Sequence, residues 1–284
     1  CAGPFSATAR PMMDGCITAG AHYLDITGEI DVIEAGHDRH DRAAAAGIAM
    51  MPAVGFDVVP SDCLAATLAA ELPHATHLQL AFTGSGGFSP GTAKTMVEGL
   101  PQGGRARING RLERVPTAWK TREIPFREGV REGVTIPWGD VASAYYSTGI
   151  PNIEVYLADS SLKPKQMRRM RWLLPLTRFG FVQNFLKRRI EKNVPGPSDR
   201  AREKSRSSLW GRVEDSQGGA VEATLETLGG YPLTVLTTVT VLEKVLAGEG
   251  PKGYATPSMA FGKDFILTMP ETDLKIESRA TAAA

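Results

Sequence analysis

Two short turns hold the acidic side chains best placed to do chemistry. The first turn contains Asp25, Thr27, Gly28 and Glu29, and the second contains Gly55, Phe56 and Asp57. A carboxylate in such a turn can bind a ribose hydroxyl, or act as a general acid or base where burial raises its pKa. We expect Asp57 and Asp25 to be catalytic. Asp62 is a weaker candidate, because it and Thr27 can serve simply as helix caps.

The elements around these turns form a βαβ unit. Apolar runs at 22–26 and 48–54 are predicted strands, and the segment 30–46 between them has the composition of a helix. A βαβ unit implies a parallel sheet, and such sheets bind ligands at the carboxyl ends of their strands. Both turns follow a strand, so we expect them to lie side by side and to form one site.

A helix predicted over 6–20 precedes this unit and gives the order (β)αβαβ. We therefore expect an α/β fold whose first domain, residues 1–72, is the second half of a doubly wound Rossmann-like domain. The next domain, residues 73–230, contains the hairpin signal Asn109-Gly110. Its predicted strands cover 77–82, 105–108, 111–115, 120–124, 152–157, 207–214 and 220–228. This pattern indicates an α+β domain with mostly antiparallel strands. Near the end, the many apolar residues of 232–246 predict a well-buried helix.

A glycine-rich loop follows the strand predicted at 77–82. The loop and the first turn of the helix after it contain Gly87, Ser89, Gly91, Thr92 and Lys94. Free N–H groups at the start of a helix can hold a carboxylate, a phosphate or a thioester oxygen. We expect these five residues to bind substrate. The alternative is a plain turn between domains.

The charge of the chain is concentrated in one segment. The formal net charge is only +1, which gives no reason to expect a nucleic-acid partner. The segment Lys163–Arg206 holds fourteen Lys and Arg residues against three acidic ones, a balance of +11, with many apolar and aromatic residues among them. We expect an anionic partner, either a membrane surface or an acidic protein. The alternative is a surface helix pair whose aromatic side chains lie in the core or a dimer interface.

Other features limit the class of protein. Three cysteines without metal-ligand spacing indicate reduced thiols in a cytoplasmic protein. His37 and His40 lie three residues apart but lack a third ligand nearby, so we expect no metal site. No apolar run reaches the ~18 to 20 residues of a membrane span. Without a start methionine or a signal peptide before Cys1, the chain is expected to begin within a longer protein.

The chain contains four motifs in a fixed order. They are Cys1-Ala-Gly-Pro-Phe5, Gly20-Ala-His-Tyr-Leu-Asp-Ile-Thr-Gly-Glu29, Gly55-Phe-Asp-Val-Val-Pro-Ser-Asp62 and the loop that ends in Gly91-Thr92. Together they resemble the saccharopine dehydrogenase-like oxidoreductases, and most of all the branch that includes trans-acting enoyl reductases. The resemblance runs over nearly the whole chain, through Thr256-Pro-Ser-Met-Ala-Phe-Gly262.

This resemblance implies an enzyme that uses NADP or NAD and transfers hydride to a C=C or C=N bond of a small-molecule or acyl-chain substrate. It also implies a homodimer, and an acidic acyl carrier protein as partner of the basic segment. The cysteines favour a location in the cytoplasm, and the basic segment favours peripheral contact with a membrane. Residues 73–230 would bind substrate and form the dimer, and residues 231–284 would return to the dinucleotide-binding domain. The residues implied to contact the cofactor are Gly3, Pro4, Phe5, Asp25, Thr27, Gly28, Glu29, Gly55 and Phe56.

The resemblance places the glycine-rich phosphate loop of the cofactor site upstream of Cys1. That loop supplies the N–H groups that hold the pyrophosphate. We therefore expect the 284-residue chain by itself to bind NADPH poorly or not at all and to have little or no activity alone. The alternative function is a non-catalytic Rossmann-fold binding protein that associates with a membrane or a carrier protein through its basic helices.

Overall fold

The structure is a computed structural model that describes residues 5–84, 97, 99, 101, 103–159, 164–169, 173, 174, 176, 177, 179–193 and 204–280. Its helices are α1 (Phe5–Ala19), α2 (Ile30–His37), α3 (His40–Ala45), α4 (Val59–Glu71), α6 (Asp140–Thr148), α7 (Pro164–Arg169), α8 (Gly180–Asn193), α10 (Gly230–Leu246), α11 (Pro257–Phe261) and the 3-10 helix η3 (Phe265–Thr268). Its strands are β1 (Tyr23–Leu24), β2 (Ala49–Met51), β3 (His77–Gly84), β4 (Gly104–Ile108), β5 (Arg111–Val115), β6 (Thr121–Phe126), β7 (Gly129–Thr135), β8 (Asn152–Leu157), β9 (Arg206–Glu214), β10 (Ala220–Leu228), β11 (Gly253–Tyr254) and β12 (Asp273–Ala280).

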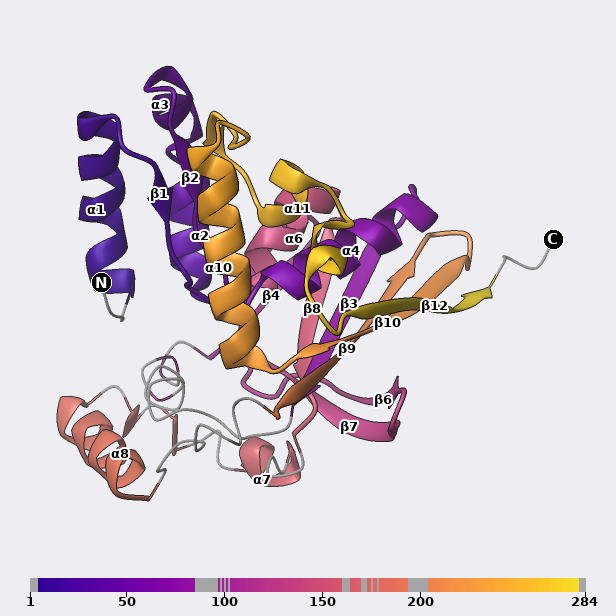
Figure 1. Cartoon of the computed structure of the whole chain (residues 1–284). Helices are drawn as coiled ribbons and strands as arrows, with labels where there is room; N and C mark the ends of the chain where they lie inside the picture. The colour runs from indigo at the N-terminus through magenta and orange to yellow at the C-terminus, as the bar shows by residue number, and fades with distance from the viewer. Residues whose placement is uncertain are drawn as a thin grey trace.

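The first sheet is small and parallel. Its strand order is β1-β2-β11, and β1 pairs with β2 through Tyr23 opposite Met50. The helices α1, α2, α3 and α10 lie around it (Figure 1). The predicted βαβ unit is confirmed, but the helix expected over 30–46 is two helices. The chain leaves the helix at Asp38 and Arg39, where the Arg39 guanidinium turns back to bond Asp14 of α1.

The second sheet is large and mixed. Its strand order is β12-β10-β9-β3-β8-β4-β5, and β7 pairs with β8 and carries β6. Most neighbours are antiparallel, and β3 with β8 is a parallel pair. The expected α/β class with a mixed, mostly antiparallel second sheet is therefore confirmed. The strand β12 joins this large sheet beside β10, a pairing that the sequence prediction did not include.

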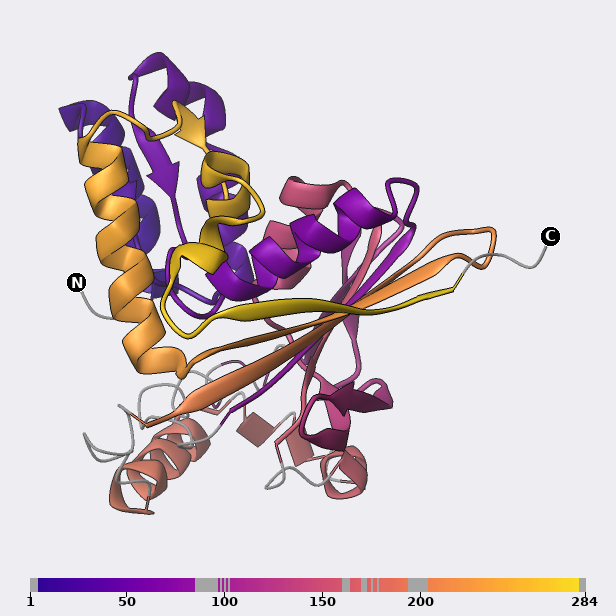
Figure 2. The same ribbon diagram turned by 45° about the vertical axis from the view of Figure 1, so that its right-hand side comes forward.

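Different elements pack on the two faces of the large sheet. Figure 2 shows α4 and α6 over one face and the β6–β7 hairpin on the other side. Side chains alternate along each strand, so Leu78 and Leu80 of β3 join the core under the helices. Ala81 instead joins Trp210 and Ile124 in a smaller cluster beneath the hairpin. The helices α4 and α6 thus lie between the face of the large sheet that they cover and the region that carries the two turns.

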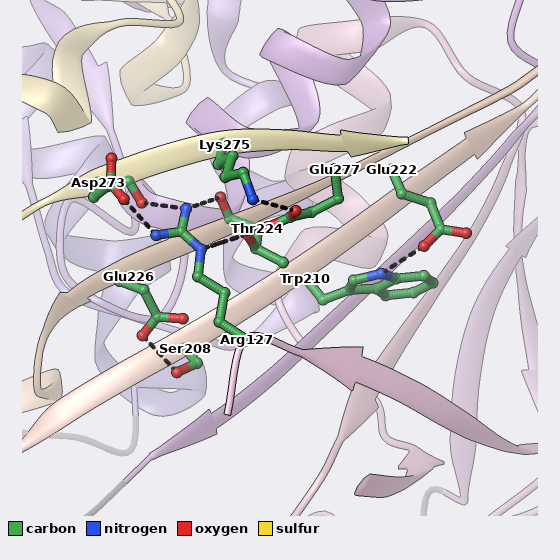
Figure 3. A network of polar contacts seen from close by, with 9 residues as sticks. All are labelled: Arg127, Ser208, Trp210, Glu222, Thr224, Glu226, Asp273, Lys275 and Glu277. Atoms are coloured by element: carbon green, nitrogen blue, oxygen red, sulfur yellow. Dashed lines mark hydrogen bonds and ion pairs between the residues drawn. The ribbon is translucent and has the colours of Figure 1, made fainter. Parts of the chain in front are cut away.

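Arg127 links the turn of the β6–β7 hairpin to β10 and β12. Arg127, in the hairpin turn, donates from Nε to Thr224 Oγ1 at 2.7 Å and from Nη2 to the Asp273 carbonyl at 3.1 Å, and it forms an ion pair with the Asp273 carboxylate. Figure 3 shows this guanidinium across β10 and β12, close to Glu277. A planar fork of donors suits such a site better than a lysine would. The polar face of the sheet is therefore organised around Arg127.

The helix α10 is buried on only one side. Leu233, Thr237, Val241 and Val245 face the core, and Thr237 Oγ1 donates to the Val54 carbonyl at 2.9 Å. The opposite side chains are exposed, among them Val235, Val239, Leu242 and Leu246. The prediction of a well-buried helix was therefore wrong. Apolar residues surround the whole helix, but only one stripe of it reaches β2 and its turn.

Within the described ranges, no helix is both long and apolar enough to cross a membrane. The expected helical region after residue 163 is present as α7 and α8, separated by residues that the structure describes only in part.

A buried arginine joins the two sheets. Arg107 of β4 donates from Nε to the Val141 carbonyl at 2.9 Å, from Nη1 to the Gly110 carbonyl at 3.0 Å and from Nη2 to Glu34 Oε1 at 2.7 Å. Its guanidinium also lies 4.2 Å from the centre of the Tyr145 ring. One side chain thus links α2, β4 and α6.

We expect Arg107→Ala to lower the free energy of unfolding by about 3–5 kcal/mol, because it leaves two carbonyls and a carboxylate without their buried donor. Urea denaturation measures the change. The control is Arg105→Ala on the same strand, whose ion pair with Asp31 is long at 3.4 Å and which should cost less than about 1 kcal/mol. Equal losses in the two variants would show that Arg107 does not hold the sheets together.

Candidate functional site

The two acidic turns lie together at the carboxyl ends of β1 and β2. The Asp25 carboxylate accepts a hydrogen bond from the Ala53 N–H at 2.9 Å, and the Asp25 carbonyl accepts one from the Val54 N–H at 2.8 Å. A Cβ built on Gly28 would lie only 2.6 Å from Asp57 Oδ2, so the first turn directly touches the second. The structure therefore brings Asp25, Gly28 and Asp57 into one place, as the strand order predicts.

Asp25 has partners on both of its carboxylate oxygens. Oδ1 accepts from the N–H groups of Thr27 and Ala53, and Oδ2 accepts from the Tyr23 hydroxyl at 2.5 Å. Burial raises the pKa of Asp25, while these three hydrogen bonds favour its ionised form. The same burial and the nearby carboxylate raise the pKa of Tyr23 well above its ordinary value. These contacts make Asp25 an anchor for both turns, and its catalytic role stays a prediction.

Glu29 caps the helix α1. Its Oε1 accepts from the Phe5 N–H and its Oε2 from the Ser6 N–H, both at 2.9 Å. A carboxylate is stabilised at the positive end of a helix dipole, and here it also satisfies two N–H groups that lack helical partners. Thr27 is fully buried, and its Oγ1 accepts from the Glu29 N–H at 3.0 Å. The glutamate is thus committed to α1 rather than to the helix that follows it.

The carboxyl group of Asp57 lies in the second turn and differs from those of Asp25 and Glu29 in its bonding. Its side chain is partly buried, and among the residues that the structure describes no donor bonds to it. Its carbonyl accepts from Trp138 Nε1 at 2.8 Å, which fixes the backbone of the turn. Burial raises the pKa of Asp57 to about 7. A carboxyl with this pKa is present in both protonation states near neutral pH, which suits a general acid or base.

Aromatic rings and the helix α10 surround the second turn. Phe56 lies edge-on to Phe82 at 6.4 Å, and Phe82 lies 4.9 Å from Trp138, so an apolar wall adjoins Asp57. The Phe56 N–H donates to Thr234 Oγ1 at 3.0 Å. A Cβ on Gly55 would lie 3.0 Å from Thr234 Cγ2, so this glycine allows α10 to pack closely. Gly55 and Phe56 therefore fix the returning helix as well as the turn.

Two further carboxyl groups lie buried behind the turn. Asp140 accepts from Ser61 Oγ at 2.7 Å, and Asp62 accepts from the Ser258 N–H at 2.7 Å, while Asp140 Oδ2 and Asp62 Oδ1 have no partner among the described residues. Burial raises the pKa of both groups, and the nearby Asp62 and Asp57 raise that of Asp140 further. The sequence analysis did not select Asp140. Its only signal was an acidic residue in the first turn of a helix.

Several predicted residues cannot be placed. Gly3 and Pro4 lie outside the described residues, and so do Gly87, Ser89, Gly91, Thr92 and Lys94, which were expected to bind substrate. Phe5 begins α1 and is partly buried. In the part of the chain that the structure describes, no group of three or more His, Cys, Asp and Glu residues could hold a metal ion.

The chain is similar to known oxidoreductases over part of its length. A trans-acting enoyl reductase of Mycobacterium tuberculosis is 36% identical over 107 residues, which are 34% of this chain and 25% of that protein. A saccharopine dehydrogenase-like oxidoreductase of Mus musculus is 35% identical over 63 residues, which are 22% of this chain and 15% of that protein. The resemblance inferred from the motifs is confirmed by these homologues. The chain thus matches a quarter or less of the length of these relatives.

The solved structures give a match that covers more of the chain. A saccharopine dehydrogenase (L-Glu forming) from Saccharomyces cerevisiae superposes with a TM-score of 0.62 at 11% identity, over 96% of this chain and 83% of that chain. At this identity the likeness concerns the fold alone. No family model matches the chain.

We expect Asp57→Asn to change stability in a pH-dependent way. Folding raises the pKa of Asp57 from 3.8 to about 7, so the folded chain binds more protons than the unfolded chain between these values. Ionisation of Asp57 therefore lowers stability as the pH rises, and the uncharged Asn escapes this loss. The melting temperature of the variant minus that of the parent chain should therefore increase as the pH is raised from about 5 to about 8. Each kcal/mol of relative stability that the variant gains raises this difference by about 2 to 4 °C.

Differential scanning fluorimetry at a series of pH values measures this change. The control is Asp31→Asn, which alters an exposed carboxylate on α2 and should give no such trend. A constant difference between Asp57→Asn and the parent at every pH would contradict the raised pKa.

Proposed function

We propose that the chain is the proton-handling part of an NAD(P)-dependent oxidoreductase that reduces a C=C or C=N bond. The observation that carries this proposal is Asp57, a partly buried carboxyl with a pKa raised to about 7 at the carboxyl end of a parallel strand. The names of the relatives support the oxidoreductase class. The fold of the yeast saccharopine dehydrogenase supports the same architecture.

The chemistry of such a reduction explains why a carboxyl group is needed. A nicotinamide cofactor, where the whole protein binds one, would supply the hydride. The atom at the other end of the C=C or C=N bond then gains negative charge and must receive a proton. Asp57 can donate that proton when protonated and can be reprotonated near neutral pH, because its pKa is about 7. The wall formed by Phe56, Phe82 and Trp138 keeps water from part of its surroundings.

The described residues do not fit the phosphate groups of a nicotinamide cofactor. A pyrophosphate is usually held by free N–H groups at the start of a helix. In this chain Glu29 already accepts from the first N–H groups of α1, and its negative charge would repel a phosphate. Neither turn, 25–29 or 53–58, contains Lys or Arg. Among the described residues, the two turns therefore provide a place for proton transfer without a matching place for phosphate.

The finer features of this function rest on the resemblance to the relatives alone. We propose a small-molecule or acyl-chain substrate, a homodimer and a cytoplasmic location on that ground. The second candidate function is a non-catalytic Rossmann-fold binding protein, and the capping of α1 by Glu29 favours it.

We expect the 284-residue chain to bind NADPH with a dissociation constant well above the micromolar range. The reason is that Glu29 already accepts from the first N–H groups of α1 and that neither described turn contains Lys or Arg. Titration of NADPH fluorescence measures the affinity. Micromolar binding would show that residues outside the described ranges hold the phosphates, and that the site is more complete than we propose.

We expect the chain to oxidise NADPH slowly when NADPH is present at millimolar concentration together with an enoyl thioester or an imine. The loss of NADPH absorbance measures this oxidation. Asp57→Asn should lower turnover about tenfold or more, a loss of about 1.4 kcal/mol in transition-state stabilisation, with little change in KM. Asp31→Asn is the matched control and should leave turnover unchanged. No oxidation with either substrate would refute the proposed reduction and leave the binding protein.

A further inference from the structure

The helix α8 and the residues just before it expose several aromatic rings. Phe179, Phe181 and Phe185 are 54%, 74% and 61% exposed, and Leu176 is 48% exposed. The rings of Phe179 and Phe181 stack with their centres 5.8 Å apart, so they form a patch rather than scattered residues. Monomeric proteins rarely leave such a contiguous apolar patch in water unless it meets a partner or a membrane.

The outward face of α8 changes from aromatic to basic along the helix. Positions 181, 185, 188 and 189 lie on one face, because residues three and four apart are neighbours on a helix. Phe181 and Phe185 occupy the first part of this face, and the exposed Arg188 and Arg189 occupy the next turn. Val182 and Leu186, which flank this face, are partly buried. The exposed rings and the exposed arginines of α8 provide the two contributions by which surface helices bind anionic membranes, which are apolar burial and electrostatic attraction.

The charge of the surrounding sequence indicates the charge of the partner. Lys163–Arg206 has a balance of +11, whereas the rest of the chain holds 18 basic and 28 acidic residues. Such a segment is attracted to an anionic surface and repelled by a cationic one. An acidic carrier protein would satisfy the charges but would leave the three exposed phenylalanine rings without an explanation.

The placement of α8 leaves it accessible to a flat surface. Both views show α8 at one extremity of the molecule, beyond the end of α10 that joins β10 (Figures 1 and 2). Arg168 of α7, the helix that precedes α8 in the chain, donates from Nε to the Ala118 carbonyl at 3.1 Å and so anchors α7 beside the large sheet.

We propose that this surface, formed by Leu176, Phe179, Phe181, Phe185, Arg188 and Arg189, docks on an anionic lipid bilayer. The phenylalanine rings enter the boundary between headgroups and acyl chains, and the arginines contact the lipid phosphates. Each basic residue close to an anionic surface strengthens binding about fivefold, and salt weakens this contribution.

Co-sedimentation with lipid vesicles tests the proposal. The chain is mixed with vesicles of phosphatidylcholine alone, or of phosphatidylcholine and phosphatidylserine in equal amounts, at low and at high salt. We expect sedimentation with the mixed vesicles at low salt, little with phosphatidylcholine alone, and a large reduction at high salt. Binding that is equal for the two compositions, or absent from both, would overturn the proposal.

Two variants test the residues. Phe181→Ser combined with Phe185→Ser should reduce vesicle binding at least tenfold, and Arg188→Glu should reduce it at least about fivefold. The matched controls are Leu246→Ser, at the other end of α10 and 71% exposed, and Arg111→Glu, in the exposed turn of β5. Both controls should bind as the parent chain does.

All of these side chains are exposed, so circular dichroism should show that every variant folds. Equal binding by the parent chain and the two α8 variants would overturn the assignment. Retention on an immobilised acidic carrier protein, without binding to the mixed vesicles, would also overturn it and would identify a protein partner instead.

Discussion

The candidate site depends on the Asp25 carboxylate, which joins the ends of two parallel strands. Parallel strands end at the same edge of a sheet, but their turns are not otherwise connected. Asp25 connects them by accepting from Thr27 in its own turn and from Ala53 in the next one. Ala53 has a φ of 67°, a left-handed conformation that is unfavourable for a residue with a Cβ. The hydrogen bond from its N–H offsets part of that cost and positions the following residues, which include Asp57.

The carboxyl groups of this region differ because their surroundings differ. Asp25 is bonded on both oxygens and Glu29 is held by a helix N-terminus, so the structure gives each of them a positional role. Asp62 and Asp140 are fully buried, with partners that also join separate elements. Asp57 alone combines partial exposure, an apolar wall and a carboxyl without a described partner. Among these carboxyl groups, Asp57 is therefore the best candidate for a role in catalysis.

Much of the fold could be predicted from local sequence patterns, whereas the partners of individual side chains could not. The strands and the hairpin at Asn109-Gly110 follow from residue types within a few positions, and the adjacency of the two turns follows from the βαβ unit. Glu29 was expected to contact the cofactor, but its carboxylate bonds N–H groups that lie 23 and 24 residues earlier in the chain. The prediction that α10 is well buried was wrong, because apolar composition alone does not show which side of a helix packs against the core. The role of Arg107 depends on carbonyl groups from three-dimensional neighbours, which no local pattern encodes.

The arrangement of α10 relates the candidate site to the proposed membrane surface. Thr234, near the start of α10, bonds the turn that carries Asp57. Both views place α8 beyond this same end of α10 (Figures 1 and 2). If α8 lies on a bilayer, the end of the molecule that holds Asp57 is the end nearest the lipid. An acyl chain that partitions into the bilayer could then reach the site without crossing bulk water, where exposing its apolar surface costs about 0.8 kcal/mol for each CH₂. Under the proposed docking, this position of α8 (Figures 1 and 2) and the aromatic side chains beside Asp57 would favour an acyl chain over a small polar molecule as the proposed substrate.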